Sequence, residues 1–100
     1  MGKEISMNAV AFQEENVWIV QGIEYNLVAM ARSVQDIPKA FANILVERFH
    51  VAEHLGLDPF LGVGPAPDRF RQMFDEAMTE VKMVSPLSRA NATVRLMEAA

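Results

Sequence analysis

Three side chains near the middle of the chain have types and spacing that could bind a metal ion. Glu47, His50 and His54 follow one another at helical spacing, so a helix here would present one carboxylate and two imidazoles on one face. Such groups are ligands for zinc or iron. The same spacing also fits the solvent-facing side of a helix, and no further ligand or general base is indicated elsewhere. We therefore expect no metal and no cofactor, and a metal-dependent enzyme is kept only as a second alternative.

The sequence lacks the other common arrangements for catalysis. There is no cysteine, and no serine lies in a G-x-S-x-G turn. The stretch Gly62-Val63-Gly64 lacks the Lys-Ser/Thr pair of a phosphate-binding loop. The adjacent acidic pairs at 14–15 and 75–76 point apart in a strand or helix, so neither pair converges on one bond. These observations favour a protein that is not an enzyme.

Five other residues are candidates for contact with a protein partner: Trp18, Gln21, Glu24, Tyr25 and Arg48. Trp and Tyr dominate the energetics of protein interfaces, although a tryptophan within a strand also suits the core. Arg48 falls in the apolar stripe of its predicted helix. Its stem could cover the core while its head reaches water or pairs with Glu24, or it could contact a partner's carboxylate.

Bulk composition limits the classes of function further. The chain has 100 residues, of which 51% are hydrophobic and 22% charged, and its net charge is −4. This composition predicts one globular domain over residues 1–100. The acidic balance and scattered basic residues argue against nucleic-acid binding by this chain alone. Without a long apolar run, a secretory leader or cysteine, we expect no membrane contact and a cytoplasmic location.

Alternating apolar residues predict three strands in the first third of the chain. They are expected at Ile5–Phe12, Val17–Tyr25 and Leu27–Arg32, with a tight turn at 13–16 that Asn16 tolerates. The run from 17 to 20 is apolar on both faces, unlike a strand with one side in water. We expect a helix on one side of it and a second helix or another copy of the protein on the other.

Helical spacing predicts a long helix from Val34 to Leu55, with Ser33 as N-cap and Gly56 as C-cap. The segment 56–67 is a Gly/Pro-rich loop. A second helix is expected over 68–83, followed by a final strand over 92–97. The predicted fold is α+β, of order β-β-β-α-(α)-β. It comprises a small antiparallel sheet of three to four strands. A long helix packs on one face of this sheet, and the helices are expected to lie largely on that face.

The stretch VWIVQGIEYNLVAMARSVQDIPKAFANIL resembles the core segment of the HicB-like antitoxin superfamily. In that family a strand runs into a Q-(C/G)-(L/I)-E-Y-(D/N) step, followed by a short strand, a polar turn and a long helix. The matching positions are Trp18, Gln21, Gly22, Ile23, Glu24, Tyr25, Asn26, Ser33, Ala40, Phe41 and Leu45. The resemblance covers roughly residues 5–55.

The resemblance implies a truncated RNase-H-like fold of order β-β-β-α-β that does no catalysis. Antitoxins of this type mask a small basic ribonuclease toxin and often carry a DNA-binding module, which we do not expect in this chain. The sequence therefore predicts a stand-alone protein-interaction module that forms homodimers or higher oligomers. The alternative is an antitoxin that inhibits a small basic toxin.

Overall fold

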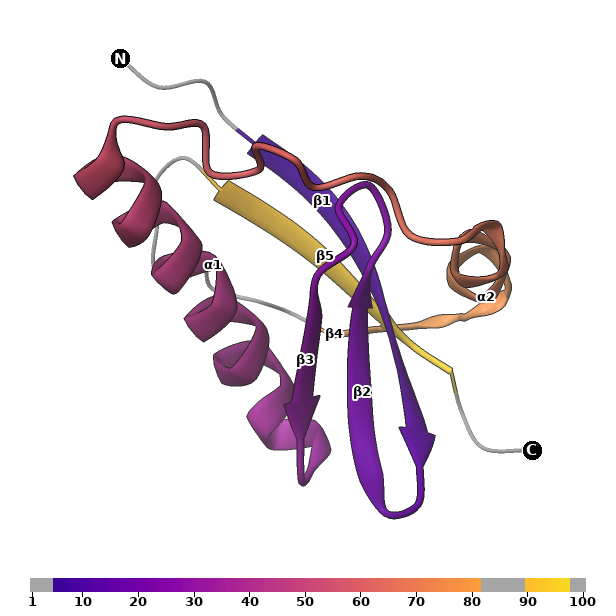
Figure 1. The fold of residues 1–100 in the computed structure, drawn as a ribbon. Coiled ribbons are helices and arrows are strands. Elements are labelled where there is room, and N and C mark those ends of the chain that lie inside the picture. Colours follow the sequence, from indigo (N-terminus) through magenta and orange to yellow (C-terminus); the bar gives the residue numbers. More distant parts are fainter. Residues whose placement is uncertain (1–4, 82–89, 98–100) are drawn as a thin grey trace.

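The computed structural model describes residues 5–81 and 90–97 of the chain (Figure 1). Its elements are β1 (Ile5–Glu14), β2 (Val17–Gly22), β3 (Val28–Ala31), a 3-10 turn (Val34–Asp36), α1 (Ile37–Leu55), α2 (Asp68–Glu76), β4 (Thr79–Val81) and β5 (Ala90–Leu96). The α+β class is confirmed. None of the described helices is long and apolar enough to cross a membrane, and the cytoplasmic location stays a prediction.

The tight turn between the first two strands lies within the predicted turn at 13–16 but is shorter, because Gln13 and Glu14 belong to β1. Glu14 pairs with Val17, and the two residues between them, Glu15 and Asn16, have φ angles of 49° and 69°. Two successive residues with positive φ form the turn whose twist matches a β-hairpin. Asn tolerates this conformation better than most residues, so the hairpin register is set locally.

The sheet is larger than predicted and is not purely antiparallel. It has five strands in the order β3-β2-β1-β5-β4. The β1–β2, β2–β3 and β4–β5 pairs are antiparallel, whereas β5 lies parallel to β1, with Ala9 opposite Val94. The prediction of three or four antiparallel strands was wrong because the return of the chain to β1 joins residues about 85 positions apart. No local pattern encodes such a parallel pairing.

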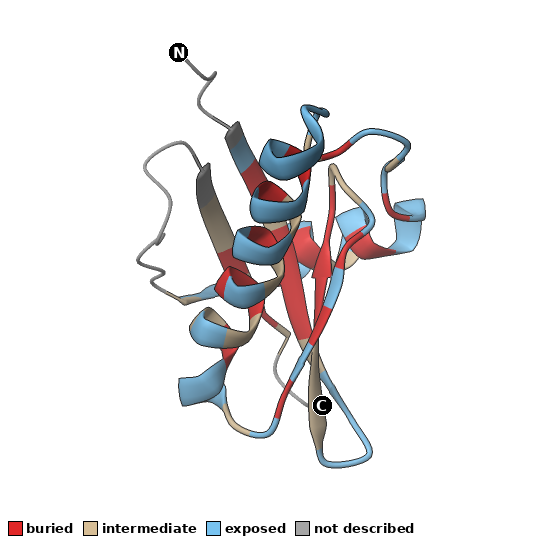
Figure 2. Cartoon of the chain, turned by 60° about the vertical axis from the view of Figure 1, so that its left-hand side comes forward, coloured by how far each residue is buried: buried red, intermediate tan, exposed pale blue. Residues whose placement is uncertain are grey.

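The first face of the sheet is covered by α1 (Figures 1 and 2). Phe41, Ile37 and Leu45 are its largest fully buried side chains, at the helical spacing that the sequence displayed. They pack on residues of β1, β2, β3 and β5, including Val20 and Val94. The helix begins three residues later than predicted, because the Val34–Asp36 segment after Ser33 is a 3-10 turn. Its end is as predicted.

The helix ends at Gly56, whose φ of 68° is left-handed and whose N–H bonds back to Ala52 and Glu53. Glycine adopts this conformation without the strain that a side chain would cause.

The second helix covers the opposite face of the sheet, contrary to the prediction that the helices lie largely on one face. Phe70 and Phe74 of α2 pack on Val10 of β1 and Ile23 in a separate buried cluster. The Phe12 and Phe70 rings stack with centroids 5.9 Å apart. Both faces of the sheet therefore receive a helix, as the two-sided apolar run in β2 requires.

The predicted second helix was wrong in its last turns. It ends at Glu76, Ala77 is extended, and Thr79–Val81 forms β4 against β5. Met78, which fitted the helical pattern, is 96% exposed. The predicted extension over 82–83 lies outside the described residues. Pairing of Thr79 with Leu96 and Val81 with Val94 supplies the backbone bonds that favour a strand here.

Candidate interaction surfaces

The segment Gln21–Asn26, which carried the sequence resemblance, forms a tightly bonded corner between β2 and β3. Gln21 is buried, and its Nε2 donates to the Gly22 carbonyl at 3.0 Å and to Asn26 Oδ1 at 2.7 Å. The Asn26 N–H donates to the Gly64 carbonyl at 2.8 Å. The Ile23 carbonyl accepts from the Ala66 N–H at 2.9 Å. This corner therefore ties the loop after α1 to the sheet.

Glu24 is the charged centre of this corner. Its carboxylate accepts the backbone N–H of Asn8 at 2.6 Å, the Asn8 side-chain amide at 2.7 Å and Arg71 Nη2 at 3.0 Å. The Arg71 contact joins α2 to the corner and replaces the Glu24–Arg48 pair considered from sequence. Partial burial acts to raise the pKa of Glu24, but the hydrogen bonds from Asn8, its own backbone and Arg71 outweigh burial and hold the pKa below 4.5.

The Glu24→Gln variant is expected to lose about 2 kcal/mol of unfolding free energy at neutral pH, because three donors would face a neutral amide. A carboxyl whose pKa is lowered by folding stabilises the fold above its unfolded pKa, near 4.5, and this stability is lost as pH falls through the lower folded value. Urea unfolding between neutral pH and about pH 3 should therefore show a shallower acid decline in Glu24→Gln than in the wild type. Glu47→Gln, at an exposed position of α1, is the matched control. If the free energy of unfolding fell equally with acid in wild type and Glu24→Gln, the lowered pKa of Glu24 would be wrong.

The two predicted aromatic contact residues both pack within the chain. The Tyr25 ring stacks on Phe60 with centroids 4.0 Å apart and planes at 13°, and Phe49 contacts Phe60 in an edge-to-face arrangement with centroids 5.8 Å apart. Trp18 is partly buried, on the same face of β2 as Val20, and packs against the core under α1. Both residues support the fold, and a role for either in partner binding stays a prediction.

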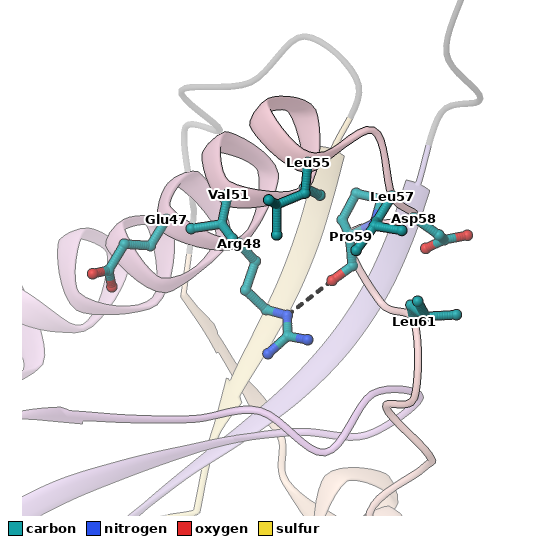
Figure 3. A pocket seen from close by; sticks show the side chains of 9 residues that line it. Glu47, Arg48, Val51, Leu55, Leu57, Asp58, Pro59 and Leu61 are labelled. Carbon is teal, nitrogen blue, oxygen red and sulfur yellow. Dashed lines mark hydrogen bonds between the residues drawn. The ribbon is translucent and has the colours of Figure 1, made fainter.

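Arg48 lies at the floor of an apolar groove between the end of α1 and the loop that follows it (Figure 3). Its Nε donates to the Pro59 carbonyl at 2.9 Å, so the guanidinium holds the loop at a fixed distance from the helix. The groove has a volume of about 370 Å³. Its exposed apolar lining is Val51, Leu55, Leu57 and Leu61. Glu47 and Asp58 add two carboxylates to this lining.

A second group of exposed apolar side chains lies at the β3 edge of the sheet. Val28 is 48% exposed and Met30 is 65% exposed, on the face opposite α1. Ile19 of β2, partly buried, faces Met30 across the strand pair. The sequence reasoning named Arg48 in the groove but missed the exposed apolar residues of both surfaces. The signal that could have found them was the surplus of apolar residues at 28 and 30 and at 51–61, beyond what the core pattern uses.

The candidate metal-binding residues do not form a site. Glu47, His50 and His54 are all exposed on α1. Within the described residues, no group of three or more His, Asp or Glu side chains is placed to hold a metal ion.

Comparison of the chain with protein-family models, curated proteins and solved structures finds no match.

Proposed function

We propose that this chain is a non-catalytic protein-interaction module of HicB-like type that assembles with further copies of itself. The observation that carries the proposal is the exposure of apolar side chains in two contiguous groups, at β3 and in the groove beside α1. Contiguous exposed apolar surface is characteristic of sites where another protein binds, whereas single exposed apolar residues need no explanation.

The hydrogen bonds within the Gln21–Asn26 segment support this proposal. Its polar side chains bond within the corner, and the Glu24 carboxylate is held by Asn8 and Arg71. A carboxylate fixed in this way organises structure and is poorly placed for proton transfer to a substrate. Three strands followed by a long helix are the part of the chain order that the HicB-like resemblance implies, and α2 and β4 come between that helix and β5.

A second candidate function is favoured by the chemistry of the groove. Glu47 and Asp58 line the groove together with the exposed Leu55 and Leu61, and the chain carries a net charge of −4. Such a surface suits a basic protein that inserts an apolar side chain, because opposite charge speeds encounter and apolar burial holds the complex. This is the chemistry that an antitoxin would need to bind a small basic ribonuclease.

One measurement tests both candidates: native mass spectrometry of untagged protein, alone and after mixing with lysate of the native host at moderate salt. A reversible homo-oligomer of the purified chain is the result expected from the proposal. A small basic protein bound at fixed stoichiometry, and lost with Leu55→Asp but retained with Val46→Asp outside the groove, would favour the second candidate. If the chain stays monomeric and binds no protein from the lysate, both candidate functions are wrong.

A further inference from the structure

Some backbone N–H and C=O groups of β3 point away from β2, toward the open edge of the sheet. Strand β3 lies at one edge of the sheet, and β2 is the only one of the described strands that pairs with it (Figure 1). The Gly22 N–H donates to the Leu27 carbonyl at 2.8 Å, which marks these facing residues as a hydrogen-bonded pair. Bonded and non-bonded pairs alternate along an antiparallel ladder. Ala29 and Ala31 therefore bond to β2, whereas the backbone groups of Val28 and Met30 point toward the open edge.

The bonds on the other side of β2 agree with this alternation. The Ile23 N–H donates to the Asn8 carbonyl at 2.8 Å, so the odd-numbered residues of β2 bond to β1. The even-numbered residues are thereby left to bond β3, which gives the same assignment for Val28 and Met30.

Apart from its length of four residues, strand β3 lacks the charges, prolines and bulges that usually keep an edge strand from pairing with another chain. Its sequence, VAMA, contains no charge and no proline, and its register with β2 runs without a bulge. Val28 and Met30 expose apolar side chains on one face, and Ala29 and Ala31 present only methyl groups on the other. The edge is short and uncharged, with apolar residues exposed along one face.

We infer that β3 pairs with β3 of a second copy, antiparallel about a two-fold axis at Ala29, with Val28 of each copy facing Met30 of the other. This inference rests on the proposed function and names the surface through which the copies associate. In this register the outward N–H and C=O groups of both residues find partners, because each faces an identical strand running the other way. The result is one continuous sheet across the two copies.

Charge favours a second copy over a charged partner at this edge. Two chains of net charge −4 repel at long range, but β3 brings no charged side chain to the contact. Arg32, which follows the strand, would face Asn26 of the other copy and meet no like charge. A strongly basic protein would find no carboxylate within β3 to pair with.

The size of the contact predicts a weak dimer. Stable interfaces bury about 800 Å² on each partner, more than a four-residue strand supplies. The adjoining apolar surface at Ile19, and the partly buried Ala40 and Ile44 of α1, would add to the contact. Below the standard interface size, association is transient, so we expect dissociation at about micromolar concentration.

Single cysteines test the register, since the chain has none of its own. A facing hydrogen-bonded pair has Cα atoms about 5.5 Å apart, within disulfide range, whereas the diagonal 28–28 and 30–30 pairs are about 7–8 Å apart. An equimolar mixture of Val28→Cys and Met30→Cys should form disulfide dimers under mild oxidation, and either variant alone should form few. Met30→Lys should reduce the dimer fraction in analytical ultracentrifugation about tenfold, while Val46→Lys, on exposed α1 surface, should leave it unchanged.

The outcomes separate this inference from the proposed function. A wild-type dimer that the mixture does not cross-link, or that Met30→Lys leaves intact, would overturn the β3 pairing but keep self-association through another surface. A wild type that stays monomeric up to about 100 µM would overturn both. Circular dichroism of each variant shows whether the fold is kept.

Discussion

Replacing Gly22 with alanine is expected to lower the free energy of unfolding by about 3 kcal/mol, near the upper end for an inserted methyl group in a packed site. A Cβ at this position would lie 2.4 Å from the Tyr25 carbonyl oxygen, far inside van der Waals contact. That oxygen cannot move freely, because it accepts the Leu27 N–H at 2.7 Å, and Gly22 itself donates to Leu27. The corner would have to open at the point where β2 leads into β3.

Gly64→Ala is the matched control for this prediction. A Cβ at Gly64 would meet nothing within 4 Å, so alanine there should change stability by less than about 0.5 kcal/mol. Urea unfolding followed by the fluorescence of Trp18, the single tryptophan, measures both variants. If Gly22→Ala were as stable as Gly64→Ala, the close approach of the chain at Tyr25 would be wrong.

The parts of the fold that depend on neighbouring residues were predictable from sequence. Asn16 marked the hairpin turn, which was predicted over 13–16, and Gly56 marked the end of α1, because each residue tolerates the left-handed backbone that its position requires. The apolar stripe around Phe41 likewise gave the face of α1 that is buried. In these cases the conformation and the residues that favour it lie within a few positions of one another.

The parts that depend on distant residues were not predictable. Strand β4 is stabilised by pairing with β5, which is distant in the sequence. Taken with their neighbours alone, the three residues of β4 fitted the end of a helix. The same holds for the corner, where Glu24 meets Asn8 sixteen positions away and Arg71 forty-seven positions away. The sequence indicated that Glu24 and Tyr25 matter, but their contacts come from β1, from α2 on the second face and from Phe60 in the loop after α1.

The corner and the groove are parts of one structural arrangement. Tyr25 supplies the surface on which Phe60 stacks, and Arg48 holds the carbonyl of the preceding residue, Pro59. The groove wall at Leu57 and Leu61 is therefore positioned from the sheet side and from the helix side at once. The β3 edge, by contrast, is held by its ladder with β2 and by packing of Ala29 and Ala31 in the core under α1.

Phe60→Ala is consequently expected to remove the groove while leaving the β3 edge intact. Truncating this buried ring should cost about 4 kcal/mol, because it loses its contacts with both Tyr25 and Phe49 and leaves a cavity. Phe60→Leu, which fills most of the volume, should cost less than about 1.5 kcal/mol. Under conditions where the variant remains folded, hydrogen exchange should speed up at the Asn26 and Val63 amides, which bond within and to this loop, and stay slow across β1 and β2.

The Phe60→Ala variant then distinguishes partner binding in the groove from self-association at the β3 edge. If the groove binds a partner, Phe60→Ala should lose that partner, because the wall formed by Leu57 and Leu61 is no longer held against α1. Self-association should persist in the same variant, since β3 stays paired with β2 through Ala29 and Ala31, and Val28 and Met30 keep their positions along its open edge. Loss of self-association together with the groove would mean that the copies meet through the end of α1 and not through the edge of the sheet.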